Sequence, residues 1–262
     1  MKRIHIFAKG NVDVHDSLAY SRVNDQIVWN GLDTLVAERH PNHTVRVRHE
    51  SCARWDRAGL PQEAIPEELS AKQIDLGTMT LQAQFQSQLG MRPCDVVVLS
   101  VQPDVCNPLR RHRRHGYTFF EMGLQSPDHD RWIDDTFDVV PRVTPDEAMK
   151  NLDSLTAAIR ARSNAIILVY NMSPIVPGEH IVSYRGFADS ESALVRAFNV
   201  ALIDFTKSHD VLLVDVDQIV ARAGADRLKL DLLHYHAEGY KIIAAEVLRI
   251  LEDQGLFDDG RS

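Results

Sequence analysis

Three short segments of this chain are almost uninterrupted apolar runs, and they limit the possible fold more than any other feature. They are DVVVLSV at 95–101, AIILVY at 165–170 and VLLVDV at 211–216. A strand with one solvated face alternates polar and apolar residues, whereas a strand covered on both faces has no need to alternate. The three runs therefore predict central strands of a parallel sheet with helices on both sides.

Two further β-branched runs, at 4–8 and 44–47, add strands, and segments of helical period separate the five. The clearest helix follows TPDE at 144–147, which combines an N-cap, a first-turn proline and a capping-box glutamate. The other expected helices cover residues 27–39, 78–89, 190–208 and 237–252. Because strand and helix alternate five times, we expect a flavodoxin-like, three-layer α/β/α sandwich around a five-stranded, mainly parallel sheet.

Two stretches interrupt this alternation. Residues of about 51–75 are polar and include prolines, so we expect them to loop over the surface. Residues 103–143 form a long insertion after the third strand, and insertions at strand ends of such folds are often lids or binding loops. The sequence contains no internal repeat and no linker, so we expect one domain over residues 1–262.

The charge balance and the apolar pattern exclude several classes of protein. Acidic side chains outnumber basic ones by 37 to 29, which argues against a nucleic-acid partner because phosphate binding needs clustered positive charge.

No run approaches the roughly 18 apolar residues of a membrane helix, and the apolar stretch before Lys9 is short for a secretion signal. Cys52, Cys94 and Cys106 are odd in number and widely spaced, unlike a disulfide framework or a cysteine zinc site. We therefore expect a cytoplasmic protein without a membrane partner, of undetermined oligomeric state.

Polar side chains follow the strands at the ends where open parallel sheets bind their ligands. Asn11 follows the first strand, Gln102 the third and Asn171 the fourth. The fifth strand leads to Asp231 and His234, three residues apart in the turn before the last expected helix. At that separation the carboxylate can accept the imidazole Nδ1 proton and leave Nε2 free as a base. An Asp that merely caps the helix is the alternative.

The segment DLLHYHAEGYKIIAAEVLRIL at 231–251 resembles the last block of the SGNH (GDSL-type) hydrolases. In that family an Asp-x-x-His pair precedes a Gly-Tyr turn and an apolar helix. The order of the five strands also agrees with the family's fold, although only this last motif is specific. The resemblance implies ester chemistry without a cofactor, with His234 as general base and Asp231 as the group that orients it.

The family's nucleophilic serine lies in a Gly-Asp-Ser block directly after the first strand, and the chain offers two alignments with it. HDSL at 15–18 keeps Asp-Ser-Leu and requires a longer loop, and the resemblance then implies Ser17 as the nucleophile. GNV at 10–12 follows the strand directly and would place Val12 at the position of the nucleophile. We expect Ser17 to be the nucleophile; a local turn or cap made by this Asp-Ser pair is the alternative.

The resemblance also implies donors that hold the oxyanion. Gly77, in DLGT at 75–78, is the nearest equivalent of the family's oxyanion glycine. The family's Gly-x-Asn-Asp block is replaced by SVQPD at 100–104, where Gln102 offers an amide in place of the missing Asn. Asn171 and Asn11 are further candidates for oxyanion or substrate binding.

The second insertion contains the cluster RRHRRH at 110–115, followed closely by aromatic residues. Arginine recognises carboxylates and phosphates through two parallel hydrogen bonds, so Arg110 and Arg114 are candidate substrate-binding residues. A solvated charge run that balances an acidic surface is the alternative. One short basic stretch in an acidic chain does not indicate a nucleic-acid partner.

The sequence thus predicts an SGNH-like serine esterase, deacetylase or acyltransferase with a Ser17–His234–Asp231 triad. The expected substrate is the acyl ester of a small polar or carbohydrate-like molecule, and we expect neither a metal nor another cofactor. Two alternatives remain open. One is an inactive binding or scaffold protein of the same fold, because the first and third blocks depart from the family pattern. The other is a metal-dependent phosphoesterase that uses Asp13, His15 and His234.

Overall fold

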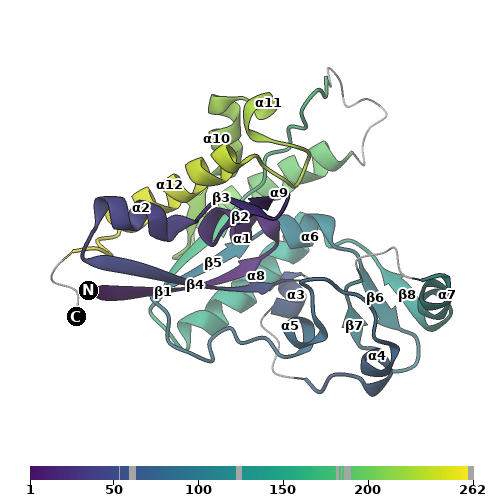
Figure 1. Cartoon of the computed structure of the whole chain (residues 1–262). Helices are drawn as coiled ribbons and strands as arrows, with labels where there is room; N and C mark the ends of the chain where they lie inside the picture. The colour runs from purple at the N-terminus through teal and green to yellow at the C-terminus, as the bar shows by residue number, and fades with distance from the viewer. Residues whose placement is uncertain are drawn as a thin grey trace.

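The main sheet has five parallel strands in the order β10-β9-β5-β1-β4 (Figure 1). The computed structural model describes residues 1–52, 54–58, 63–121, 126–180, 183, 185 and 190–258. The five strands are β1 (Lys2–Gly10), β4 (His43–Ser51), β5 (Val96–Ser100), β9 (Ile166–Tyr170) and β10 (Leu212–Val214). The parallel sheet predicted from the five apolar runs is confirmed.

Helices and their apolar residues cover both faces of this sheet, which gives three layers (Figure 1). The first face carries α1 (Val12–Leu18), α2 (Leu32–Arg39), α10 (Val216–Ala223), α11 (Ala225–Leu228) and α12 (Ala237–Asp253). The second face carries α3 (Trp55–Ala58), α6 (Gln102–Cys106), α8 (Pro145–Arg160) and α9 (Glu191–Thr206). Val96 and Val98 of β5 pack on the first face, and Val97 and Leu99 pack on the second. Burial on both sides explains why this run does not alternate.

The α8 helix begins as its sequence predicts. The Thr144 hydroxyl accepts the Glu147 N–H at 3.3 Å, and the Glu147 carboxylate accepts the Thr144 N–H at 2.8 Å, which completes a capping box. None of the helices in the described part of the chain is long and apolar enough to cross a membrane.

The two insertions fold against each other, and both contain regular structure that the sequence did not indicate. The second insertion forms an antiparallel sheet in the order β7-β6-β8. Its strands and helix are β6 (Leu109–His112), β7 (Thr118–Phe119), α7 (Pro127–Thr136) and β8 (Phe137–Val140). Leu69, on α4 (Glu67–Lys72) of the first insertion, shares an apolar cluster with Phe119 and Phe137. The first insertion, expected to loop over the surface, instead contains the short helices α3 and α4, and each insertion covers apolar residues of the other.

Two expected helices begin or end at other residues. The helix expected at 27–39 is α2 only from Leu32, because the preceding residues form a hairpin of β2 (Ser21–Val23) and β3 (Gln26–Trp29). The helix expected at 78–89 is only α5 (Leu81–Phe85). It ends early because the next residues bind β4: Ser87 Oγ and the Gln88 N–H donate to Glu50 at 2.8 and 3.1 Å.

Gly31 allows the chain to turn tightly into α2, and replacing it by alanine tests whether this position requires a glycine. Its φ is +80°, and an added Cβ would lie 2.0 Å from the Ala19 carbonyl oxygen. Gly116 has a similar φ of +74° with nothing within 4 Å of the added Cβ, so it is a matched control. We expect Gly116→Ala to lower the free energy of unfolding by about 1–2 kcal/mol. Gly31→Ala should lower it by roughly 1–3 kcal/mol more, measured by urea unfolding. Equal losses would contradict a steric role for Gly31.

Candidate active site

The carboxyl ends of β1 and β5 determine where the candidate site lies. The chain leaves β1 at Gly10, and α1 begins only two residues later, at Val12. Gly10 is closely packed, since an added Cβ would lie 2.7 Å from Val14 Cγ2 and 3.0 Å from Ser100 Cβ. The exit of β1 therefore brings Asn11 and Val12, both half-buried, to this edge of the sheet.

Asp231 and His234 make the contact that the sequence predicts. Asp231 Oδ2 lies 2.8 Å from His234 Nδ1, and Asp231 Oδ1 accepts the backbone N–H groups of Leu233 and His234. Partial burial opposes ionisation of Asp231, but the hydrogen bonds from His234 and Leu233 outweigh it and lower the pKa of this carboxyl. About half of the His234 side chain is exposed. No hydrogen bond to Nε2 forms within the described ranges, so this nitrogen is available to a substrate or to water.

Gln102 connects this turn to the end of β5. Its Nε2 donates to the Leu233 carbonyl at 3.4 Å, and its backbone N–H donates to Ser100 Oγ at 3.0 Å. The residue is 2% exposed, and no partner for its Oε1 is found among the described residues. Gln102 thus lies beside the 231–234 turn, as expected for a residue of one shared site, while its catalytic role stays a prediction.

Ser17 lies in the last turn of α1 and is fully buried. Its hydroxyl donates to the Asp13 carbonyl at 2.7 Å and lies 3.1 Å from the Tyr170 hydroxyl. The described residues include no hydrogen bond between Ser17 and His234. This placement does not suit a nucleophile, because a substrate could reach the hydroxyl only after α1 had moved away from the sheet. The alternative alignment, with Val12 directly after β1, agrees better with the start of α1.

Asn171 and Gly77 make hydrogen bonds within the fold. Asn171 Nδ2 donates to Asp215 Oδ1 at 2.9 Å, and Asn171 Oδ1 accepts the Asp217 N–H at 3.1 Å. Asn171 thereby joins the end of β9 to α10. Gly77 is exposed, and its N–H donates to Asp75 Oδ1 at 2.9 Å. Both residues have a structural explanation that does not involve a substrate.

Asn11 has a neighbour that sequence reasoning missed. Asn11 Nδ2 donates to Asn107 Oδ1 at 3.4 Å, and Asn107 Nδ2 donates to the Cys52 carbonyl at 3.2 Å. Asn11 Oδ1 is buried without a partner in the described structure. Asn107 follows α6 in the second insertion, and nothing in its local sequence distinguishes it from an ordinary loop asparagine.

Asp13 is a second residue that the sequence did not mark clearly. It is 5% exposed, and its carboxylate accepts a hydrogen bond from the Ser100 hydroxyl. Burial raises the pKa of Asp13 to about 6, although the hydrogen bond from Ser100 acts in the opposite direction. A buried carboxyl that changes its charge near neutral pH therefore lies directly beneath the exit of β1.

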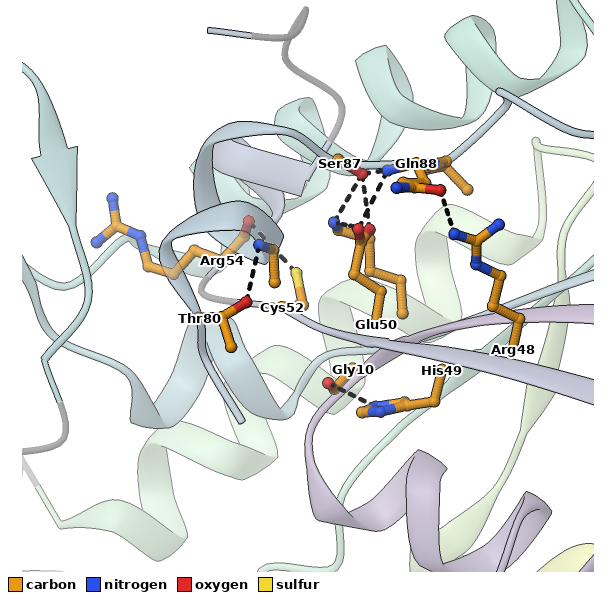
Figure 2. Close-up of polar contacts among 12 residues, drawn as sticks. Gly10, Arg48, His49, Glu50, Cys52, Arg54, Thr80, Ser87 and Gln88 are labelled. Atoms are coloured by element: carbon orange, nitrogen blue, oxygen red, sulfur yellow. Dashed lines mark hydrogen bonds and ion pairs between the residues drawn. The ribbon is translucent and has the colours of Figure 1, made fainter. Parts of the chain in front are cut away.

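A polar cavity of about 450 Å³, here called the β4 pocket, opens beside the same exit. His15 of α1 and His49 of β4 line it, with ring centroids 5.0 Å apart. His49 Nε2 donates to the Gly10 carbonyl at 3.1 Å (Figure 2). Burial, and then the neighbouring His15, lower the pKa of His49 to about 4, so His49 is neutral at pH 7. The other lining groups include the hydroxyls of Thr78 and Thr80 and the amide of Gln82.

Of the arginines expected to bind substrate, Arg110 lies on β6 and Arg114 lies in the turn that follows this strand. Arg110 Nε lies 2.6 Å from Glu121 Oε1, and its Nη1 lies 3.4 Å from Asp134 Oδ1. Two carboxylates thus neutralise Arg110, which makes it a poor anion receptor. Arg114 is exposed, and its backbone N–H donates to His112 Nδ1. These ion pairs of Arg110 agree with the alternative interpretation, in which the basic cluster balances an acidic surface and does not bind a substrate.

The metal-dependent alternative finds no support in the geometry. Among the described residues, the ligand atoms that converge belong to Glu68, His112 and His115, and not to Asp13 or His234. His112 Nδ1 accepts two backbone N–H groups, which leaves the ring proton on Nε2, and Nε2 donates to Glu68 at 2.9 Å. A metal ion at Nε2 would have to displace that proton. The hydrogen bonds of His112 therefore explain why these side chains lie close together without a metal ion.

Solved structures with a similar fold include hydrolases. A protein provisionally assigned as an SGNH hydrolase, from Slackia heliotrinireducens, is 16% identical over 95% of this chain and 98% of its own, with a TM-score of 0.50. The acetylxylan esterase Axe2 from Geobacillus stearothermophilus is 13% identical over 94% and 93%, with a TM-score of 0.52. A family 3 carbohydrate esterase from Talaromyces cellulolyticus is 12% identical over 100% of both chains, with a TM-score of 0.51. No family model matches the chain, and no curated protein matches it in sequence.

The buried carboxyl of Asp13 leads to a prediction about stability and pH. Its pKa is about 6 in the folded chain and close to 3.8 when unfolded, so the folded state holds the proton more tightly. The stability of the wild type therefore falls as pH rises from about 4 to 6, with a full cost of about 1–3 kcal/mol at pH 7. We expect Asp13→Asn to be more stable than the wild type by that amount at pH 7, and the difference to vanish near pH 4. Urea unfolding at both pH values measures this; equal effects at both would contradict it.

Proposed function

Because the chain has the fold of the SGNH hydrolases, we propose that it hydrolyses small polar acyl esters at the edge formed by Asn11, Gln102 and His234. The observation that carries this proposal is the Asp231–His234 pair. The carboxylate holds Nδ1 at 2.8 Å, and Nε2 lies on a half-exposed ring. An imidazole oriented in this way is suited to general base catalysis.

An acetylated carbohydrate is the substrate class that we propose. The structural relatives Axe2 and the family 3 enzyme are described as an acetylxylan esterase and a carbohydrate esterase. The β4 pocket supports the same class, because its imidazole, hydroxyl and amide groups can exchange hydrogen bonds with sugar hydroxyls. Its volume of about 450 Å³ lies in the usual range for sites that bind small molecules.

In this proposal a water molecule, and not Ser17, attacks the ester. Val12 occupies the exit of β1 and has no hydroxyl, and the Ser17 hydroxyl is held inside the fold. His234 Nε2 would take a proton from water while the water oxygen bonds to the carbonyl carbon. The imidazolium would then return the proton to the leaving alkoxide as the ester bond breaks. Asp231 stays ionised and stabilises the imidazolium.

Gln102 and Asn11 are the side chains that could hold the oxyanion. Each amide nitrogen carries two protons and makes one long hydrogen bond of 3.4 Å, to Leu233 O and Asn107 Oδ1 respectively. The second proton of Asn11, a half-buried residue, can therefore meet the developing negative charge, whereas Gln102 is 2% exposed and would have to become accessible first. One such donor is worth about 3–4 kcal/mol of transition-state stabilisation in enzymes of this kind.

A non-catalytic binding protein is the rival function. The valine at the exit of β1 favours it, because a site without a nucleophilic side chain could bind a sugar and leave the ester intact. The two functions differ in a measurable way, since only the hydrolase requires the base.

Hydrolysis of p-nitrophenyl acetate and of acetylated xylo-oligosaccharides by four proteins tests this proposal. The proteins are the wild type, His234→Gln, Ser17→Ala and the control His236→Gln. We expect His234→Gln to lower kcat/KM by about 10²–10⁴-fold, because the base is lost. Ser17→Ala and His236→Gln should keep nearly full activity, since Ser17 is buried and His236 is a neighbouring exposed imidazole outside the pair.

Other outcomes would reject parts of the proposal. Loss of activity in Ser17→Ala, together with a burst of p-nitrophenol in the wild type, would show that a serine acyl-enzyme forms. Equal rates in all four proteins would show that His234 is not the general base. Binding of the oligosaccharide without release of acetate would support the rival function.

A further inference from the structure

The second face of the main sheet is covered unevenly. The apolar cluster beneath α8 and α9 contains residues of β5 and β9 but none of the described residues of β1 or β4. In the parallel register of β1 and β4, His5 pairs with Arg46 and Phe7 pairs with Arg48, so these four side chains share that less covered face. The alternation of valine and arginine in TVRVRH at 44–49 is the sequence signal of a strand with one uncovered side.

A cavity of about 680 Å³, here called the arginine cavity, is lined by these residues. Arg46 and Arg48 of β4 contribute to it, and Arg92 joins them from the segment before β5. Phe7, which is 7% exposed, and the exposed Pro93 are apolar residues of its lining. The volume lies within the range of sites that bind small molecules.

The three guanidinium groups of this cavity have no ion-pair partner among the described residues. In the ranges that the structure describes, none of Arg46, Arg48 and Arg92 forms an ion pair with a carboxylate. Arg48 donates to the amide oxygen of Gln88, which carries no charge (Figure 2). In a chain with a net charge of −8, three uncompensated cations around one cavity indicate an anionic ligand.

The carboxylates closest in sequence to these groups have other partners. Glu50, on the same strand as Arg48, lies 2.7 Å from Lys9 Nζ and accepts the Ser87 hydroxyl at 2.8 Å (Figure 2). Asp95, which follows the segment of Arg92, accepts the backbone N–H of His5 at 2.7 Å. Glu50 is thus paired with a cation, whereas Asp95 accepts an uncharged N–H and keeps its negative charge next to His5 and Cys94 of the lining. One carboxylate against three guanidinium groups leaves the cavity with a net positive charge.

We infer that the arginine cavity binds a phosphorylated organic molecule of nucleotide size. Guanidinium groups match phosphate oxygens through two parallel hydrogen bonds, and a single carboxylate would leave two of the three cations unpaired. The phosphate groups contact Arg46, Arg48 and Arg92, and the organic part lies against Phe7 and Pro93. Arg92 also lines a smaller adjoining cavity of about 170 Å³ with Arg162, which adds a fourth cation for a second phosphate.

Most of the arginine cavity lies away from the candidate active site. Phe7 precedes Gly10 by three residues, or roughly 10 Å along a strand, and Arg46 precedes Ser51 by five. Arg48 lines both cavities, whereas Arg46 and Arg92 do not line the β4 pocket. The inference therefore does not depend on the ester hydrolysis proposed for His234.

Isothermal titration calorimetry with four probes tests this inference. The probes are ADP, pyrophosphate, inorganic phosphate and citrate, each added to the full chain at low salt and at 0.2 M salt. We expect ADP to bind more tightly than pyrophosphate, phosphate or citrate, and its affinity to fall with added salt. The double variant Arg46→Gln/Arg92→Gln should lose at least tenfold in affinity for ADP, and Arg92→Gln alone should lose part of it.

The variant Arg222→Gln is the matched control. Arg222 is exposed in the last turn of α10, on the first face of the sheet, and its replacement changes the net charge equally. We expect it to bind ADP as the wild type does.

An equal loss of ADP affinity in Arg222→Gln and Arg92→Gln would overturn the site, as would the absence of ADP binding at millimolar concentration. Equal affinity for citrate would overturn the assignment to phosphate, and equal affinity for pyrophosphate would overturn the contact with an organic group. Circular dichroism of each variant shows that it is folded.

Discussion

Parallel pairing of β1 with β5 on one side and with β4 on the other is the constraint on which the rest of the structure depends. Parallel strands end at the same edge, so Gly10 lies opposite Ser51 of β4 on one side and next to the end of β5 on the other. The helix that follows β1, the Gln102 segment and the β4 pocket all begin at this edge. The same register places the arginines of β4 beside Phe7 on the less covered face, so one pairing produces both candidate sites.

Buried polar atoms without partners gather at the edge where β1 and β5 end. In the described structure, Asn11 Oδ1, Asp13 Oδ1 and Gln102 Oε1 have none. Folded proteins satisfy most buried polar groups, so such exceptions mark places where water or a ligand completes the hydrogen bonding. Ser17 and Asn171 differ, because the fold itself satisfies their side chains. The first set of side chains can still form hydrogen bonds with a substrate, whereas Ser17 and Asn171 hold helices and strands together.

Local patterns in the sequence were sufficient wherever a contact spans a few residues. The Asp231–His234 contact lies within one turn, and the Thr144 capping box lies within one helix start, so both could be predicted from spacing. The position of Ser17 could not be predicted in this way, because it depends on whether the chain turns into α1 directly after Gly10 or several residues later. Close packing of Gly10 against Val14 and Ser100 decides this, and no single motif contains it.

The sequence by itself determined the parallel sheet and its alternation with helices, because burial on both faces requires continuous apolar runs. It also determined the Asp231–His234 turn, because backbone geometry sets the distance between residues three apart. Only the tertiary structure decided that the insertions pack on each other through Leu69 and Phe119, that Asn107 lies next to Asn11, and that Arg46 and Arg92 share a cavity. These contacts join residues far apart in the chain, and their energy depends on how the elements pack together rather than on local sequence.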